Sequence, residues 1–208
     1  MPYFPDHSYS DQAVYAQDYF RQVTHAAATI DPDALTRAGE LIADVVRTGG
    51  SIFSCGNGGS AAIANHLVCD CLKGTRADTE IRPRVFSLST TVELITAIGN
   101  DFGYEDVFCY QLESTARQGD LLIAISSSGA SPNVAKALRT AREMGMHSLA
   151  LVGFAGGEAA ELADVALWVR AENYGVVEDV HQSLMHIFAQ FLRQSNIKDP
   201  ALFGQRKF

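Results

Sequence analysis

Residues 51–60 read SIFSCGNGGS, a short apolar run that passes directly into a turn of glycine, asparagine and serine. Residues 121–131, LLIAISSSGAS, show the same pattern of an apolar run followed by a turn of small residues. Small residues let backbone N–H groups approach an anion, and the start of a following helix adds partial positive charge. Serine hydroxyls supply further hydrogen-bond donors. Two such turns in one chain predict a sugar phosphate that is held by neutral groups.

Around these turns, short apolar runs alternate with helical stretches, which favours an α/β fold with a parallel sheet covered on both faces. Ligand sites in such sheets lie at the carboxyl ends of the strands, where both serine turns fall. The expected strands are 51–55, 84–88, 120–126, 148–153 and 165–169, and the expected helices are 60–73, 91–98, 105–117, 132–145, 158–163 and 177–195.

The chain is expected to form a single domain over residues 1–208. Residues 10–48 read as helical, with a break and a new start at Asp31-Pro32 and a stop at Gly49-Gly50. The α/β core then covers 51–195. The polar tail, 196–208, is expected to be a loosely packed extension or a subunit contact.

Composition excludes several classes of protein. A net charge of −8 and a pI near 5.1 argue against a nucleic-acid partner. No run of 18 apolar residues predicts a membrane span, and the first residues lack the pattern of a signal peptide. We therefore expect a cytoplasmic protein without a membrane partner.

Two groups of polar side chains are candidates for chemistry. His66 and Asp70 are four residues apart and share one helix face. Glu178 and His186 lie on the last helix, where they could meet that pair across an interface. Two histidines and two carboxylates suit Zn²⁺, and other divalent ions are possible. By spacing alone, a partly solvated His–Asp pair and a polar stripe on an amphipathic helix are the more ordinary interpretations.

Three motifs in order resemble the sugar isomerase (SIS) domain family, and within it the phosphoheptose isomerases. They are Ser54–Ser60 (SCGNGGS), Gly99–Gly103 (GNDFG) and Ile125–Ser131 (ISSSGAS). The likeness covers roughly residues 10 to 195. It implies a flavodoxin-like, five-stranded parallel sheet flanked by helices, and a homotetramer whose oligomer core contains the N-terminal helices. It also implies active sites between subunits.

The resemblance also implies roles for individual residues. The turn Asn57-Gly58-Gly59-Ser60 and Asp101 match the sugar site. Ser60, Ser126, Ser128 and Ser131 match phosphate-binding serines, with Ser127 in a position that is usually threonine. His66, Asp70, Glu178 and His186 match the ligands of a divalent metal, for which zinc is favoured. Asp70 then serves as the catalytic base and His186 as the acid.

Three positions depart from the family pattern. Asp70 stands where the family has glutamate, so its carboxylate is retracted by about 1.3–1.5 Å unless the helix shifts. Glu178 replaces a neutral glutamine. Ala61 follows the turn serine where a histidine is usual.

The implied activity is ketose–aldose isomerisation through an enediol, most specifically of sedoheptulose 7-phosphate to D-glycero-D-manno-heptose 7-phosphate. Such a step supplies precursors for lipopolysaccharide or capsule. Two alternatives remain open at this point. One is a non-catalytic SIS protein that binds a replication-initiator protein, and the other is an SIS isomerase for another phosphosugar.

Overall fold

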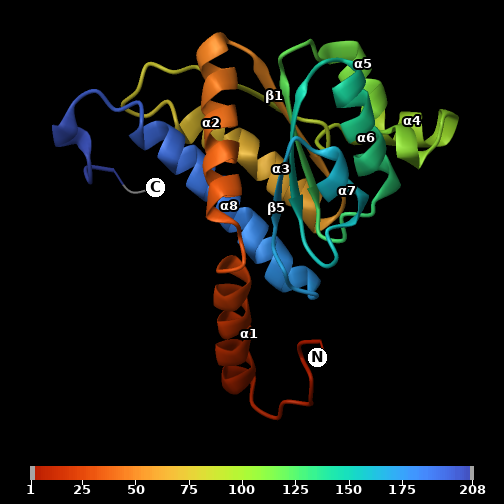
Figure 1. The fold of residues 1–208 in the computed structure, drawn as a ribbon, viewed down its shortest axis with the longest axis vertical. Coiled ribbons are helices and arrows are strands. Elements are labelled where there is room, and N and C mark those ends of the chain that lie inside the picture. The colour runs from red at the N-terminus through yellow and green to blue at the C-terminus, as the bar shows by residue number, and fades with distance from the viewer. Residues whose placement is uncertain (1–2, 207–208) are drawn as a thin grey trace.

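The computed structural model describes residues 3–206, which form a parallel sheet between two layers of helices (Figure 1). The strands are β1 (Ser51–Gly56), β2 (Arg84–Ser87), β3 (Leu121–Ser126), β4 (His147–Val152) and β5 (Val165–Trp168). The α-helices are α1 (Gln12–Ala27), α2 (Pro32–Thr48), α3 (Gly59–Cys69), α4 (Val92–Asp101), α5 (Cys109–Thr115), α6 (Pro132–Glu143), α7 (Gly157–Leu162) and α8 (Tyr174–Gln194). Three short elements complete the chain: the π-helix η1 (Asp70–Gly74) and the 3₁₀ turns η2 (Tyr104–Asp106) and η3 (Pro200–Leu202).

The strand order is β2-β1-β3-β4-β5, and every neighbouring pair is parallel. This order confirms the expected five-stranded, flavodoxin-like sheet. The direction of winding reverses between β1 and β3, which is where open α/β sheets place their ligands. The two serine turns follow these two strands and therefore lie side by side.

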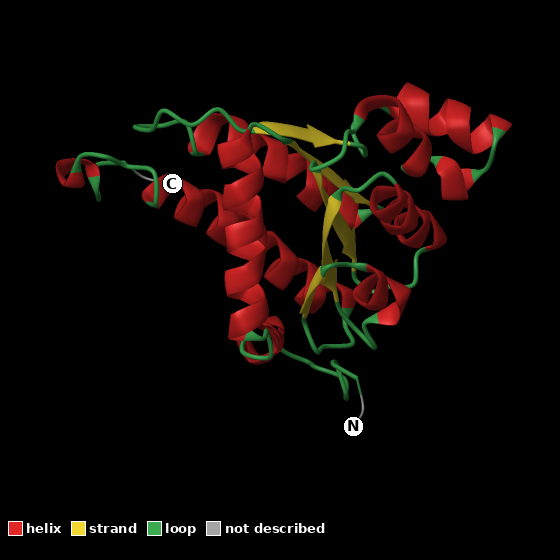
Figure 2. Cartoon of the chain, turned by 45° about the horizontal axis from the view of Figure 1, so that its top comes forward, coloured by secondary structure: helices red, strands yellow, loops and turns green. Residues whose placement is uncertain are grey.

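Alternate residues of β1, β3 and β4 belong to two separate cores on the two faces of the sheet. Figure 2 shows the helix layers that cover these faces. On one face, Ile52 and Ile123 pack with α2, α3 and α8. On the other, Phe53 and Leu122 pack with helices α5 and α6. Burial on both faces explains why these strands are continuously apolar. Helix α1 extends away from the two layers, beyond the N-terminal part of α8 (Figure 1).

Two expected helices are interrupted in the structure, and two others have shifted ends, since α4 continues to Asp101 and α8 already begins at Tyr174. The helix expected over 60–73 ends as an α-helix at Cys69, because the Thr75 N–H bonds to the Asp70 carbonyl at 3.1 Å and opens a π turn. The helix expected over 105–117 is divided into η2 and α5, because Val107 and Phe108 turn inward and are buried in the core between them.

The C-terminal tail is partly anchored. Arg206 forms two hydrogen bonds to Asp78, at 2.6 and 2.9 Å, and Lys198 pairs with Glu80 at 2.5 Å. The hydrogen bond from Arg206 is the largest of the effects that keep the pKa of the Asp78 carboxyl below its usual value. The tail therefore contacts the loop that follows the π-helix. Among the described residues, no helix is both long and apolar enough to cross a membrane.

Candidate active site

The first serine turn leads from β1 into α3 with its backbone tightly folded. Gly58 caps the helix with a φ of +53°, which glycine adopts at little cost. A Cβ on Gly56 would lie 2.7 Å from the Cβ of Ser60, so only glycine allows this approach. Ser60 itself is buried in the first turn of the helix. The N–H groups at the start of α3 are thus directed to the carboxyl edge of the sheet.

The second serine turn leads from β3 into α6 and is held by its own hydroxyls. Ser126 Oγ accepts a hydrogen bond from the Gly129 N–H at 3.1 Å and lies 3.2 Å from Ser131 Oγ. Ser128 Oγ accepts from the Ala130 N–H at 3.2 Å. The Ser127 hydroxyl is buried and finds no partner among the described residues. An orphaned donor in a preformed turn suits an oxyanion ligand.

The glycine-rich turn after β4 supports this second turn. The Gly153 N–H donates to the Ser127 carbonyl, and the Ala159 N–H donates to the Gly129 carbonyl, both at 2.9 Å. A Cβ on Gly129 would collide with the Gly156 carbonyl, so the two turns are packed backbone to backbone.

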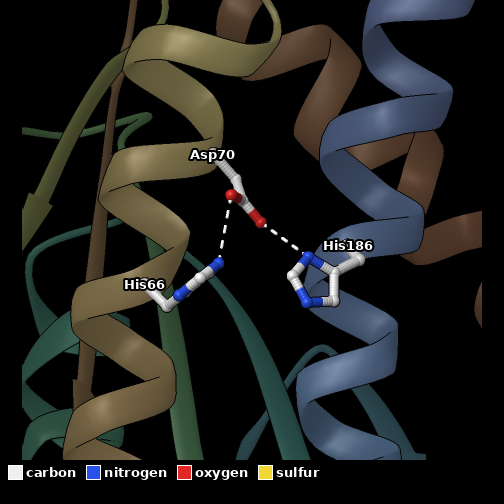
Figure 3. A group of neighbouring side chains, drawn as sticks. All are labelled: His66, Asp70 and His186. Carbon is white, nitrogen blue, oxygen red and sulfur yellow. Dashed lines mark hydrogen bonds and ion pairs between the residues drawn. The ribbon is translucent and has the colours of Figure 1, made fainter. Parts of the chain in front are cut away.

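His66, Asp70 and His186 come together between α3 and α8 (Figure 3). The two carboxylate oxygens of Asp70 each face one histidine. Oδ1 lies 3.2 Å from His66 Nε2, and Oδ2 lies 2.9 Å from His186 Nδ1. Asp70 and His186 are half-buried, whereas His66 is exposed. Despite its shorter side chain, Asp70 therefore reaches both rings from the first residue of the π-helix.

His186 is held at both ring nitrogens. Its Nε2 lies 3.2 Å from the side-chain nitrogen of Gln182, one turn earlier on α8. Because the Asp70 carboxylate accepts hydrogen bonds, His186 Nδ1 carries the proton that faces it. This contact orients the ring. The sequence showed that Gln182 shares a face with His186, but not what it contacts.

These three residues also fit a divalent metal. One donor atom from each residue lies within 4.8 Å of the other two, so two imidazoles and a carboxylate converge. That donor set suits zinc and other first-row ions.

Glu178 lies apart from the three-residue cluster. Its carboxylate packs against Gly59 at the start of α3, where a Cβ would overlap it. Burial, followed by the nearby Asp179, raises the pKa of Glu178. The structure thus places this acidic side chain at the first serine turn.

The remaining sugar-site candidates are Asn57 and Asp101. Asn57 is half-buried at the end of β1 and pairs with Asn133 of α6. Asp101 is exposed at the end of α4 and accepts a hydrogen bond from Asn100 at 2.8 Å. Asn133 and Tyr104, which also contacts Asn57, were not singled out from the sequence, since no local pattern marks contacts over 76 and 47 positions.

Known proteins resemble this chain in sequence and fold. A sequence profile described as the SIS domain matches residues 15–153. A phosphoheptose isomerase of Geotalea daltonii is 39% identical over 168 residues, which make up 81% of this chain and 84% of that protein. The solved phosphoheptose isomerase of Neisseria gonorrhoeae is 33% identical with a TM-score of 0.79, and that of Francisella tularensis is 26% identical with a TM-score of 0.81. Each structural match covers 88% of this chain and 96% of the other. These relatives favour the isomerase over the two alternative functions.

Proposed function

This chain belongs to the phosphoheptose isomerases of the SIS domain family, and on that premise we propose that it isomerises sedoheptulose 7-phosphate to D-glycero-D-manno-heptose 7-phosphate. The proposal rests mainly on the contact between Asp70 and His186, which are 116 residues apart in the sequence. Asp70 lies at the end of α3, the helix that begins at the first serine turn. His66 follows Gly59 by seven residues, about 10 Å along the helix. A linear seven-carbon sugar phosphate can span from the turn to this cluster.

The proposed phosphate site consists of hydroxyls and backbone N–H groups. Ser60, Ser126, Ser127, Ser128 and Ser131 are the proposed donors, with Gly58 and Gly59 allowing close approach. The buried, unpartnered hydroxyl of Ser127 supports this assignment. Asn57 and Asp101 are proposed to face the sugar hydroxyls.

The reaction needs a base at carbon and an acid at oxygen. In the proposed mechanism an Asp70 oxygen takes the proton from C1 of the ketose, which gives a cis-enediol. The same carboxylic acid then returns a proton to C2. His186 moves a proton between the two oxygens, so that O2 gains the proton that O1 gives up. The hydrogen bond between the two side chains holds the proposed base and acid next to each other.

His66, Asp70 and His186 are proposed to hold a divalent metal, for which zinc is favoured, with Glu178 as a further ligand after its side chain rotates away from Gly59. When bound, such an ion would polarise the substrate carbonyl. We also propose that the enzyme works as a homotetramer and supplies precursors for lipopolysaccharide or capsule.

The proposal is tested by incubating the protein with sedoheptulose 7-phosphate in D₂O. We expect an aldose product that carries solvent deuterium at C2. Asp70→Asn should abolish turnover while binding of inorganic phosphate stays within about twofold, because the serine turns are untouched. If the Asp70→Asn variant retains turnover, Asp70 is not the catalytic base. If the protein converts another phosphosugar but not sedoheptulose 7-phosphate, the proposed substrate is wrong.

A further inference from the structure

Three polar side chains from separate segments meet beside the first serine turn. Asn57 follows β1, Asn133 lies in the first turn of α6, and Tyr104 begins η2. The side-chain nitrogen of each asparagine donates to the side-chain oxygen of the other, and both distances are 2.9 Å. The Tyr104 hydroxyl donates to Asn57 Oδ1, also at 2.9 Å.

A backbone group fixes the orientation of both amides. The Val134 N–H donates to Asn133 Oδ1 at 3.0 Å, so the atom at that position must be an oxygen. The Asn57 atom that faces it is then the nitrogen, and Asn57 Oδ1 faces the nitrogen of Asn133. Since this oxygen can only accept, Tyr104 must be the donor. Asn133 is only 2% exposed, so water cannot easily replace these contacts.

From this we infer that Asn57, whose amide is oriented by Asn133, meets the substrate as a hydrogen-bond donor only, and that Tyr104 is the positioning residue that fills its last acceptor position. An amide oxygen has two lone pairs, and Asn133 and Tyr104 occupy both. One of the two hydrogens on Asn57 Nδ2 is bonded to Asn133. A single N–H remains for the ligand. The inference rests on the proposed function, because it concerns the same sugar site.

A side chain that can only donate suits the reaction better than an amide that can also accept. Negative charge grows on a substrate oxygen as the enediol forms, and a preorganised N–H stabilises that charge without reorientation. Without the Tyr104 hydroxyl, the free lone pair of Asn57 Oδ1 could accept a hydrogen bond from a sugar hydroxyl instead. Tyr104 itself is held in place because Asp106, in the same 3₁₀ turn, pairs with Lys136 of α6 at 2.7 Å. Loss of its hydroxyl should leave this turn intact.

The decisive variant is Tyr104→Phe, with Tyr110→Phe on neighbouring α5 as the matched control. Tyr104 is 59% exposed and Tyr110 is 42% exposed, so both changes should preserve the fold. We expect Tyr104→Phe to lower kcat about five- to tenfold, the effect of one hydrogen bond, while KM stays within about twofold. In an Asn57→Ala background the same change should have no further effect, because Tyr104 acts through Asn57.

A second measurement does not depend on turnover. The side-chain amide NMR signals of Asn57, assigned by their loss in Asn57→Ala, should shift in Tyr104→Phe and stay in place in Tyr110→Phe. Amide signals that do not move, an unchanged kcat, or an equal loss of kcat in the Asn57→Ala background would each overturn the inference. If the wild-type protein converts no phosphosugar, the proposed function fails, and the amide signals alone decide whether Tyr104 locks Asn57.

Discussion

Gly59 is a residue at which function and stability should separate. A side chain at this position would overlap the carboxylate of Glu178, which is the mobile end of a long side chain and can move aside. Gly59→Ala should therefore displace Glu178 while it stabilises the first turn of α3 by up to about 1 kcal/mol. We expect at least a tenfold loss of turnover with no fall in Tm, measured by a coupled isomerase assay and by calorimetry.

Gly39→Ala is the control for this prediction. Gly39 lies within α2, and a Cβ there would meet nothing within 4 Å. It should gain similar stability, so it is a control for the Tm of Gly59→Ala and not for its turnover. If Gly59→Ala keeps full activity, Glu178 has no role at the first turn.

Individual residues show what the sequence alone could predict. The four-residue spacing of His66 and Asp70 predicts that they share a helix face, and the structure brings them within 3.2 Å. The placement of Glu178 against Gly59 could not be predicted in this way. It depends on how α8 crosses α3, and neither helix encodes that crossing in its own periodicity.

At the scale of elements, every strand lies within one residue of its expected ends, because a fully buried parallel strand is a short, continuous apolar run. The π-helix after Cys69 was missed. Its widened turn depends on Thr75, whose hydroxyl also donates to the Cys71 carbonyl at 2.5 Å. Such a bond leaves no repeat in the sequence, and yet it sets the position of Asp70.

Helix α8 is joined to the sheet by a buried histidine that should make stability depend on pH. His181 is fully buried, its Nε2 lies 3.2 Å from the Val152 carbonyl, and burial lowers its pKa to about 4. The unfolded chain, with an ordinary histidine pKa near 6.5, takes up this proton first as the pH falls. The stability that neutral, buried His181 contributes is therefore fully present above about pH 6.5. About 2 kcal/mol of it should be lost by pH 5 and about 3 kcal/mol by pH 4.

Urea unfolding at pH 7 and pH 5 tests this dependence. His181→Gln keeps a nitrogen donor for Val152 but cannot titrate, so it should show a smaller loss of unfolding free energy between the two pH values than the wild type. His147→Gln, at an exposed position on β4, should behave like the wild type. Equal losses of unfolding free energy in all three proteins would show that His181 does not cause the decrease in stability at acid pH.

At the scale of the whole molecule, the composition and the order of strands and helices predict the architecture. What the exposed surfaces contact depends on the folded structure and cannot be predicted from the sequence. The tail was expected to pack loosely or to contact another subunit, which stays a prediction, and the structure adds a contact of Arg206 with Asp78 next to the π-helix. Opposite charges 128 positions apart carry no local signal in the sequence.

The proposed tetramer makes a prediction about the groove between α2 and α8. This groove has a volume of about 480 Å³ and includes Ile187 and Phe191, which are 48% and 61% exposed. Large apolar side chains that gather in this way are typical of a surface that another chain covers. Ile187 directly follows His186, so a second copy seated here would also border the cluster at Asp70 and help to exclude water from it.

Phe191→Asp should therefore reduce the mass of the particle in analytical ultracentrifugation and lower turnover, because a buried charge without a partner prevents association. Val92→Asp, which places the same charge at an exposed position on α4, should change neither property. A wild-type protein that sediments as a monomer at micromolar concentration would remove the tetramer. A Phe191→Asp variant of unchanged mass would show that the subunits meet through another surface, of which exposed α1 is the next to test.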